Sequence, residues 1–258
     1  MAKRPGKVAV LPKNFQPSAE VELIRIGRNG DGGYLVEPRS LYNADVLVGL
    51  GINDDWSFEQ DFLERNAVPL FAFDGSISYK IFIRKAVRTL LRLRKLKEIV
   101  RSVRTALEYR RFFRGSKQHL SNFVGMPSSE KSIDLRELFE THLPQFSSVF
   151  LKIDIEGGEY RLLNDLGLLS NRISGLVIEF HDLDLHLDRV ASFIEDFPLH
   201  LCHTHVNNYG GIDKSSIPLV IECTFTSETS DERWQGRLPH SLDMANNSAL
   251  DDVPLEFS

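Results

Sequence analysis

The stretch that most constrains the fold of this chain is VFLKIDIEGGEYRLL, residues 149–163. An apolar run stops at Asp154 and Glu156, and a Gly-Gly pair and a helix-like spacing of apolar residues follow. This order predicts a buried strand that brings two carboxylates to the edge of an α/β sheet, where such sheets bind their ligands. A carboxylate placed there costs free energy unless something binds it, so the stretch favours a functional role over a structural one.

The composition fits one large α/β domain. The chain has 258 residues, of which 42% are hydrophobic, which is enough for a substantial core. We expect residues 1–258 to form a single domain. Residues 1–20 contain three prolines and no periodic pattern, so we expect them to form an extended N-terminal arm.

Targeting signals and cysteine pairs are missing from the sequence. No run of eighteen apolar residues is present, and the N-terminal stretch lacks the apolar segment of a secretory signal. Cys202 and Cys223 lie far apart without CxxC spacing, which indicates reduced thiols and no zinc site. These features predict a cytoplasmic protein.

One segment is strongly basic although the chain carries a net charge of −5. Residues 80–117 contain fourteen Lys and Arg residues against two Glu residues, a local charge of +12. Apolar residues recur every three or four positions, which predicts one or two helices inserted over 79–117; they are Ile83, Ala86, Leu90, Leu93, Val100, Val103 and Leu107.

Four interpretations of this basic insertion stay open: a solvated face, an anionic membrane surface, an anionic substrate and a partner chain. The membrane interpretation would make the protein peripheral at the inner membrane face. Aromatic residues are sparse in the segment before Tyr109, so we expect no nucleic-acid partner.

The stretch ADVLVGLGINDDWSFE has the layout of a nucleotide or nucleoside site. A strand leads into a turn that Gly49 and Gly51 permit, and a helix capped by Asp54 or Asp55 then exposes backbone N–H groups. About twenty residues later a second strand ends in Asp74, which is spaced to accept hydrogen bonds from a ribose diol. The GxG pattern alone is a weak signal, but its position in the first strand-helix unit strengthens it.

A second glycine-rich stretch, RNGDGGYLV, lies upstream of this turn. It is either a plain turn between two short strands or a backbone loop that approaches a ligand closely at Gly32 and Gly33, because glycine has no side chain in the way.

Polar residues follow three further predicted strands. Asp154 and Glu156 end one strand, Glu179 and His181 the next, and the third carries His203, His205, Asn207 and Asn208. Oxygen donors with imidazole are suited to a divalent metal, for which the candidate ligands are Asp154, Glu179, His181 and His205. The same groups suit acid–base catalysis, with His181 or Asp154 as the general base.

The order of motifs resembles the FkbM-type S-adenosylmethionine-dependent methyltransferases. The most specific motif is KIDIEGGEY, and DGGYLV, VLVGLGINDDWSFE, FDGSI and LVIEFHDL fit as well. The resemblance implies a Rossmann-like α/β fold, with a mostly parallel seven-stranded sheet flanked by helices and the basic helical segment as an insertion. It also implies methyl transfer to a hydroxyl of a sugar or other glycoconjugate.

The resemblance also assigns roles to individual residues. Gly49 and Gly51 form the cofactor turn, with Asp55, Gly32 and Gly33 nearby, and Asp74 holds the adenosine ribose. Asp154, beside Glu156, faces the sulfonium and the acceptor. Two features depart from the family pattern: the turn VGLGIN lacks the acidic residue common before the first glycine and a third small residue in the loop, and the basic insertion has no counterpart.

Two other functions are compatible with the same fold. A degenerate, cofactor-binding scaffold could dock to a membrane or an acidic partner through its basic helix. A nicotinamide-dependent oxidoreductase uses a similar turn and ribose acid, but VGLGINDD lacks a full GxGxxG, which argues against it.

Overall fold

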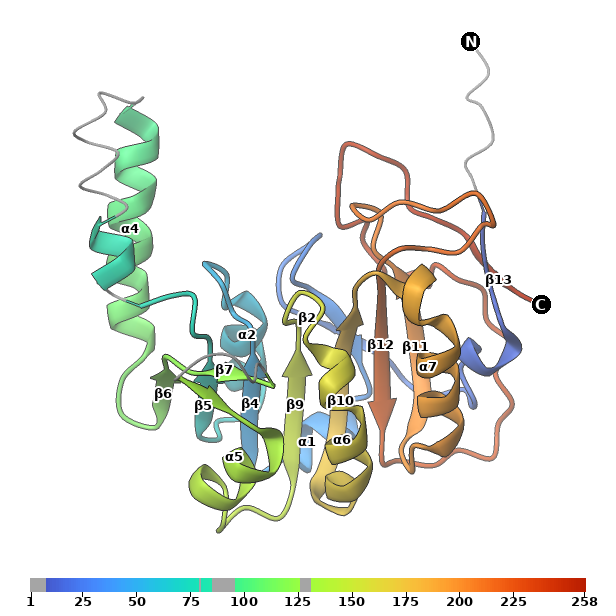
Figure 1. Ribbon diagram of the computed structural model, residues 1–258, viewed down its shortest axis with the longest axis horizontal. Coiled ribbons are helices and arrows are strands. Elements are labelled where there is room, and N and C mark those ends of the chain that lie inside the picture. The colour runs from blue at the N-terminus through green and yellow to red at the C-terminus, as the bar shows by residue number, and fades with distance from the viewer. Residues whose placement is uncertain (1–7, 79, 85–95, 126–130) are drawn as a thin grey trace.

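A seven-stranded sheet forms the centre of the molecule in the computed structural model, which describes residues 8–78, 80–84, 96–125 and 131–258 (Figure 1). The strand order is β11-β12-β10-β9-β4-β5-β6, and only β12 runs antiparallel to its neighbours. The strands are β4 (Val46–Leu50), β5 (Leu70–Phe73), β6 (Lys117–Leu120), β9 (Val149–Ile153), β10 (Ile173–Phe180), β11 (His200–Val206) and β12 (Ile221–Thr226). The predicted Rossmann-like, mostly parallel sheet is therefore confirmed.

Helices cover both faces of this sheet, which explains why its central strands are continuous apolar runs. One face packs on α1 (Pro38–Tyr42) and α2 (Ser57–Arg65) through residues such as Leu41 and Phe62. The other face packs on α5 (Leu135–His142), α6 (Leu163–Leu169) and α7 (Leu183–Asp196). Every residue of β4, β9 and β10 is buried.

Short elements surround this core. Three two-stranded sheets pair β1 (Ala9–Leu11) with β13 (Leu255–Phe257), β2 (Ile24–Ile26) with β3 (Tyr34–Val36), and β7 (Phe123–Val124) with β8 (Ser132–Ile133). Single 3-10 turns lie at η1 (Lys13–Phe15), η2 (Glu159–Arg161) and η3 (Ser170–Arg172).

The described part of the N-terminal arm, residues 8–20, is packed against the domain. Strand β1 pairs in parallel with β13 at the other end of the chain, and Leu11 and Phe15 are fully buried. The polar C-terminal segment, which shows no pattern in the sequence, therefore contains a strand that the N-terminal arm covers.

The third strand of the sheet lies earlier than predicted. We expect it from the apolar residues of 120–126, but the sheet strand is β6, whose sequence is KQHL, and Phe123 and Val124 form the small strand β7 instead. The physical reason is that β6 is an edge strand, where polar side chains are tolerated and the apolar signal is weak.

The described part of the basic insertion includes helix α4 (Leu96–Phe112), which rises past the end of the sheet in Figure 1. Its inner face packs Ala106, Tyr109 and Phe112 around Trp56. Ala86, Leu90 and Leu93 of the predicted apolar stripe lie outside the described residues. None of the helices in the described ranges combines the length and the apolar character needed to cross a bilayer.

Candidate active site

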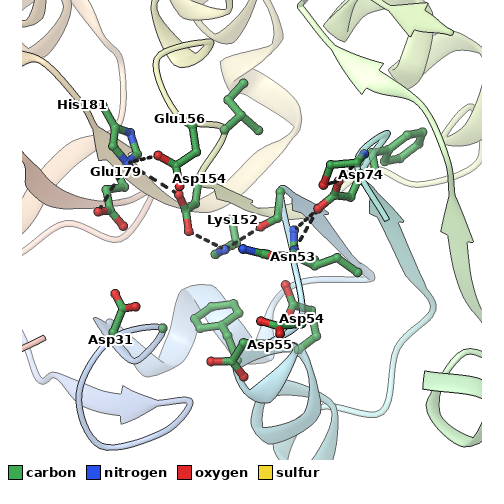
Figure 2. Close-up of a pocket in the computed structure, with 18 of the residues that line it drawn as sticks. Asp31, Asn53, Asp54, Asp55, Asp74, Lys152, Asp154, Glu156, Glu179 and His181 are labelled. Carbon is green, nitrogen blue, oxygen red and sulfur yellow. Dashed lines mark hydrogen bonds and ion pairs between the residues drawn. The ribbon is translucent and has the colours of Figure 1, made fainter. Parts of the chain in front are cut away.

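A cavity of about 800 Å³ lies beyond the carboxyl ends of β4, β5, β9 and β10, where open α/β sheets bind their ligands (Figure 2). Its lining includes most of the residues predicted to be functional: Gly32, Gly51, Asp55, Asp74, Asp154, Glu156, Glu179 and His181. Gly33, Gly49 and His205 do not line it. Helix α4 of the basic insertion contributes Arg101 to the wall.

The turn after β4 requires glycine at position 51. Gly51 has a φ of +76°, and a Cβ atom there would overlap the carbonyl oxygen of Asp154, which directly follows the neighbouring strand β9. The next turn residue, Asn53, also has a positive φ of 44°. Glu156, in the turn after β9, has a φ of 52°. Backbone strain thus gathers at both turns that face the cavity, as it commonly does at functional sites.

Asp74 braces the turn after β4. Its Oδ2 accepts hydrogen bonds from the amides of Ile52 (3.1 Å) and Asn53 (2.8 Å). Its Oδ1 accepts two more, from the amide (2.8 Å) and the hydroxyl (2.6 Å) of Ser76. These four bonds occupy the carboxylate's lone pairs and fix the turn, while contact with a ribose stays a prediction.

Glu59 brings a carboxylate from α2 to the place beside Gly49. A Cβ atom at Gly49 would lie 2.7 Å from Glu59 Oε1, so glycine makes room for this acid. Oε1 is buried and has no hydrogen-bond partner among the described residues. Burial raises the pKa of Glu59 to about 7, and the nearby Lys152 ammonium limits the rise. The sequence contains no signal for this role, because a glutamate on an amphipathic helix is usually solvated.

The upstream glycine loop and the start of α2 lie side by side. Gly32 lines the cavity, and a Cβ atom there would lie 2.7 Å from Asp55 Oδ2. Asp55 Oδ1 accepts a hydrogen bond from the Ser57 amide at 3.0 Å. The predicted cap by Asp54 or Asp55 is nevertheless wrong, because Trp56 occupies the N-cap position and no side chain caps the helix there. A side chain at Gly33 would overlap the backbone of Arg28, so this glycine is needed for packing.

His181 lies at the centre of a group of carboxylates. Its Nε2 is 3.5 Å from Glu156 Oε2, 3.7 Å from Glu179 Oε1 and 4.0 Å from Asp154 Oδ1. On the other side of the ring, Nδ1 lies 3.2 Å from Oε1 of the fully buried Glu159, which also accepts the His181 amide at 2.7 Å. Glu159 therefore orients the ring so that Nε2 faces the cavity.

The pKa values in this group reflect burial and charge together. Burial lowers the pKa of His181, but the hydrogen bond that the ring donates to Glu159 and the charges of Glu179 and Asp154 outweigh it and raise the pKa to about 9. The ring is therefore an imidazolium at neutral pH. Burial, with the charge of Asp154, holds the pKa of Glu179 well above its usual range. Glu179 also accepts hydrogen bonds from the Tyr34 hydroxyl and Asn207 Nδ2.

Lys152 provides the second cation of the site. Its side chain is almost fully buried, and Nζ donates to the Gly51 carbonyl at 2.9 Å and to Asp154 Oδ2 at 3.3 Å. Burial lowers the pKa of Lys152, but Asp154 and Glu59 raise it above its usual value overall, so the amine stays charged. Lys152 is not among the residues predicted from the sequence, although a lysine within a buried apolar strand is a usable signal.

Among the described residues, Asp154, Glu156 and His181 form the group able to hold a metal ion, with one ligand atom from each within 4.8 Å of the others. His205, also predicted as a ligand, is not part of this group. Its Nδ1 lies 3.1 Å from Glu222 Oε2 and its Nε2 lies 3.1 Å from Asp252 Oδ1, so both ring nitrogens are already engaged.

The solved structures that resemble this chain are distant. An rRNA methylase from Streptococcus thermophilus matches with 8% identity and a TM-score of 0.36, over 74% of this chain and 93% of that one. A Streptococcus pneumoniae protein in complex with S-adenosyl-L-methionine gives 11% identity and 0.34, over 76% of each chain. The fibrillarin pre-rRNA processing protein of Methanococcus jannaschii gives 8% identity and 0.33, over 84% and 85%.

The sequence comparisons are more specific. No curated protein matches the chain significantly. The family model described as the methyltransferase FkbM domain matches residues 18–201, which include the turn after β4, Asp74, Asp154 and His181. The match covers well over half of the chain and includes the cavity's principal carboxylates. The chain therefore belongs to the FkbM methyltransferase family, and it is an S-adenosylmethionine-dependent methyltransferase.

Proposed function

We propose that this methyltransferase transfers the methyl group to oxygen, on a hydroxyl of a sugar or glycoconjugate. The observation that carries the proposal is the His181 group: Nε2 faces the cavity among three carboxylates, and Glu159 fixes the ring from behind. A hydroxyl must lose its proton as it is methylated, and this arrangement provides a place for that proton.

The cavity has features that suit the cofactor. When bound, S-adenosylmethionine supplies a methyl group on a cationic sulfur, and the sulfur is the leaving group when a nucleophile attacks the methyl carbon in line. The unpartnered, buried Oε1 of Glu59 calls for a donor, and we assign it to the cofactor's ammonium group. Gly51 leaves the backbone open to close approach, and Asp74 holds that backbone rigid.

Asp154 orients the acceptor's hydroxyl, and His181 accepts its proton. Asp154 borders the cavity between Lys152 and His181, where it can orient a hydroxyl against the two cations. The proton that leaves the hydroxyl ends on Nε2 of His181, since the surrounding carboxylates stabilise the imidazolium. Only the neutral ring can accept a proton, so we expect the methyl-transfer rate to rise with pH up to about 9.

The lining of the cavity supports a carbohydrate acceptor. Besides His181 and its surrounding carboxylates, the lining contains Asp31, Asp54, Asn122 and Asn207. Carboxylates accept hydrogen bonds from hydroxyl groups, and amides both donate and accept them, so these residues suit a molecule with several hydroxyls.

A divalent cation is an alternative to this base role, because Nε2 of His181 cannot both bind a cation and accept the hydroxyl's proton. Asp154, Glu156 and His181 are the residues that would hold it, and the second ring nitrogen of His181 already contacts a carboxylate, as metal-binding histidines usually do. A cation there would supply a positive charge beside the hydroxyl. If activity survives treatment with EDTA and does not rise with Mg²⁺ or Mn²⁺, this alternative fails while the role of His181 as a base stands.

The proposal is tested by transfer of a labelled methyl group to a panel of sugars and glycoconjugates. Asp154→Asn and His181→Ala should abolish most transfer, whereas His200→Ala, at an exposed position on β11, should not. Full activity in both site variants would remove these roles. Calorimetry with S-adenosylhomocysteine separates catalysis from binding: the two variants should still bind it, and Glu59→Gln should bind it more weakly.

A further inference from the structure

Helix α4 exposes an apolar stripe to solvent. Val100, Val103 and Leu107 are 58%, 42% and 58% exposed, and their spacing places them on one side of the helix. We call these three residues the outer stripe. The short helical stretch 80–84, next to α4 in Figure 1, adds Ile81 and Ile83, which are also exposed. A solvated helix face is normally polar, so these aliphatic residues need an explanation.

Arginine residues surround the outer stripe. Arg104, Arg110 and Arg111 are exposed on α4, and Arg114 is exposed just after the helix ends. Arg110 lies beside the outer stripe by helical spacing, while Arg104 and Arg111 lie at its other edge, where they also line a groove shared with α2. The one acidic residue between positions 100 and 117 is Glu108, whose Oε1 lies 2.7 Å from Arg104 Nε. The outer face of α4 is therefore both apolar and cationic.

The inner face of α4 is already occupied. Phe112 stacks on Trp56 with ring centroids 6.3 Å apart, and the Tyr109 hydroxyl lies 2.6 Å from His119 Nδ1. These aromatic residues of α4 therefore pack against the rest of the protein and are not available to stack on nucleic-acid bases. An RNA partner would leave the outer stripe without a function, whereas a lipid surface accounts for both the aliphatic residues and the arginines.

We propose that the outer face of α4 docks on an anionic lipid bilayer. The outer stripe enters the boundary between headgroups and acyl chains, and the arginines contact lipid phosphates. Arg101, on the same helix, lines the active-site cavity, so docking holds the cavity beside the membrane surface. This inference does not depend on the identity of the methyl acceptor.

Vesicle sedimentation of the full chain tests the proposal. We expect binding to vesicles that contain phosphatidylglycerol at low salt, weaker binding at high salt, and little binding to pure phosphatidylcholine. Val103→Ser with Leu107→Ser should weaken binding about tenfold, because the apolar insertion is lost. Arg110→Gln with Arg111→Gln should weaken it about fivefold per charge removed, since each basic residue near the surface contributes about 1 kcal/mol.

Matched substitutions elsewhere keep the test specific. Leu168→Ser and Leu185→Ser remove exposed leucines on α6 and α7, and Arg233→Gln with Arg237→Gln removes two exposed charges. These controls should bind vesicles like the wild type. The proposal is overturned if the wild type fails to sediment with anionic vesicles at low salt. It is equally overturned if RNA binds with the arginines alone required, or if the outer stripe only mediates self-association in solution.

Discussion

Two histidine–carboxylate clusters lie on neighbouring parts of the same sheet, and they differ in one respect. His205 has a carboxylate within hydrogen-bond distance of each ring nitrogen, from Glu222 and Asp252, and its side chain is 3% exposed. His181 has such a partner only at Nδ1, from Glu159, and its Nε2 faces the cavity with carboxylates at 3.5 Å or more. The first cluster is closed and the second is open.

This difference shows that residue types alone do not identify a site. Both clusters contain histidine and at least two carboxylates, and both have raised histidine pKa values because negative charges outweigh burial. What separates them is whether any polar atom is left to meet a ligand. In the closed cluster, Asp252 comes from the C-terminal segment, so His205 fastens that segment to the sheet.

Loss of Nε2 of His181, the ring nitrogen that faces the cavity, should have the largest effect on the methyl-transfer rate. His181→Asn removes the proton acceptor, and we expect the methyl-transfer rate to fall by roughly 10²- to 10⁴-fold, which is the usual contribution of acid–base catalysis. The free energy of unfolding, measured by urea denaturation, should also fall at neutral pH, because the buried Glu159 loses the imidazolium partner that helps to raise the pKa of His181, so the deciding measurement is activity per folded molecule. A variant that unfolds easily but keeps its activity per folded molecule would place His181 with the closed cluster instead.

The closed cluster should lose stability on substitution but keep its activity. His205→Ala leaves Glu222 and Asp252 without their shared partner, and removing one partner of a buried ion pair costs about 3–5 kcal/mol. Activity per folded molecule should persist. Burial lowers the pKa of His205, but its hydrogen bonds to Asp252 and Glu222 raise it well above its usual value overall. The stabilising contribution of His205 is therefore fully present below the unfolded pKa and is lost as pH rises through the folded pKa.

Urea titrations measure the free energy of unfolding of the wild type and of His205→Ala at pH values from below the unfolded pKa of histidine upward. His200→Ala, at an exposed position, is the control. The gap in stability should narrow at high pH. Equal stability of both variants at every pH would show that the closed cluster does not fasten the C-terminal segment.

The sequence predicted the open cluster because its members follow two adjacent parallel strands. Asp154 comes after β9 and His181 after β10, and parallel strands bring their carboxyl ends to one edge. The apolar runs of β4, β9 and β10 identified the strands themselves. Edge strand β6 was missed because its KQHL sequence has little apolar character.

Long-range partners were beyond prediction. Nothing near His205 in the sequence indicates that its second partner lies 47 positions away, in a segment without periodic pattern. Glu59 resembles an ordinary surface residue of an amphipathic helix, and only the packing of α2 against Gly49 shows that it is buried. In both cases the tertiary fold, and not local propensity, decides whether a polar side chain is structural or available.

Glu59 provides an intermediate case, a buried carboxylate whose Oε1 has no hydrogen-bond partner within the described part of the chain. Burial raises its pKa to about 7 from about 4.5, so the folded protein retains a proton that the unfolded chain releases. Stability should therefore fall by about 3 kcal/mol as pH rises from 4.5 to above 7. Glu59→Gln should remove this dependence and be the more stable protein at pH 8. Thermal unfolding at several pH values measures it, and parallel curves for the two proteins would contradict the assignment.

Substitution of Glu156, which lies at the exposed edge of the open cluster, should have the smallest effect on kcat/KM. Its side chain is 83% exposed although Oε2 lies 3.5 Å from His181 Nε2, so water screens most of their interaction. We expect Glu156→Gln to lower kcat/KM by about two- to fivefold, corresponding to an exposed ion pair of at most about 1 kcal/mol. If kcat/KM instead falls as far as in His181→Asn, and excess Mg²⁺ or Mn²⁺ restores it, Glu156 is a metal ligand, because an exposed carboxylate matters that much only when it holds a cation.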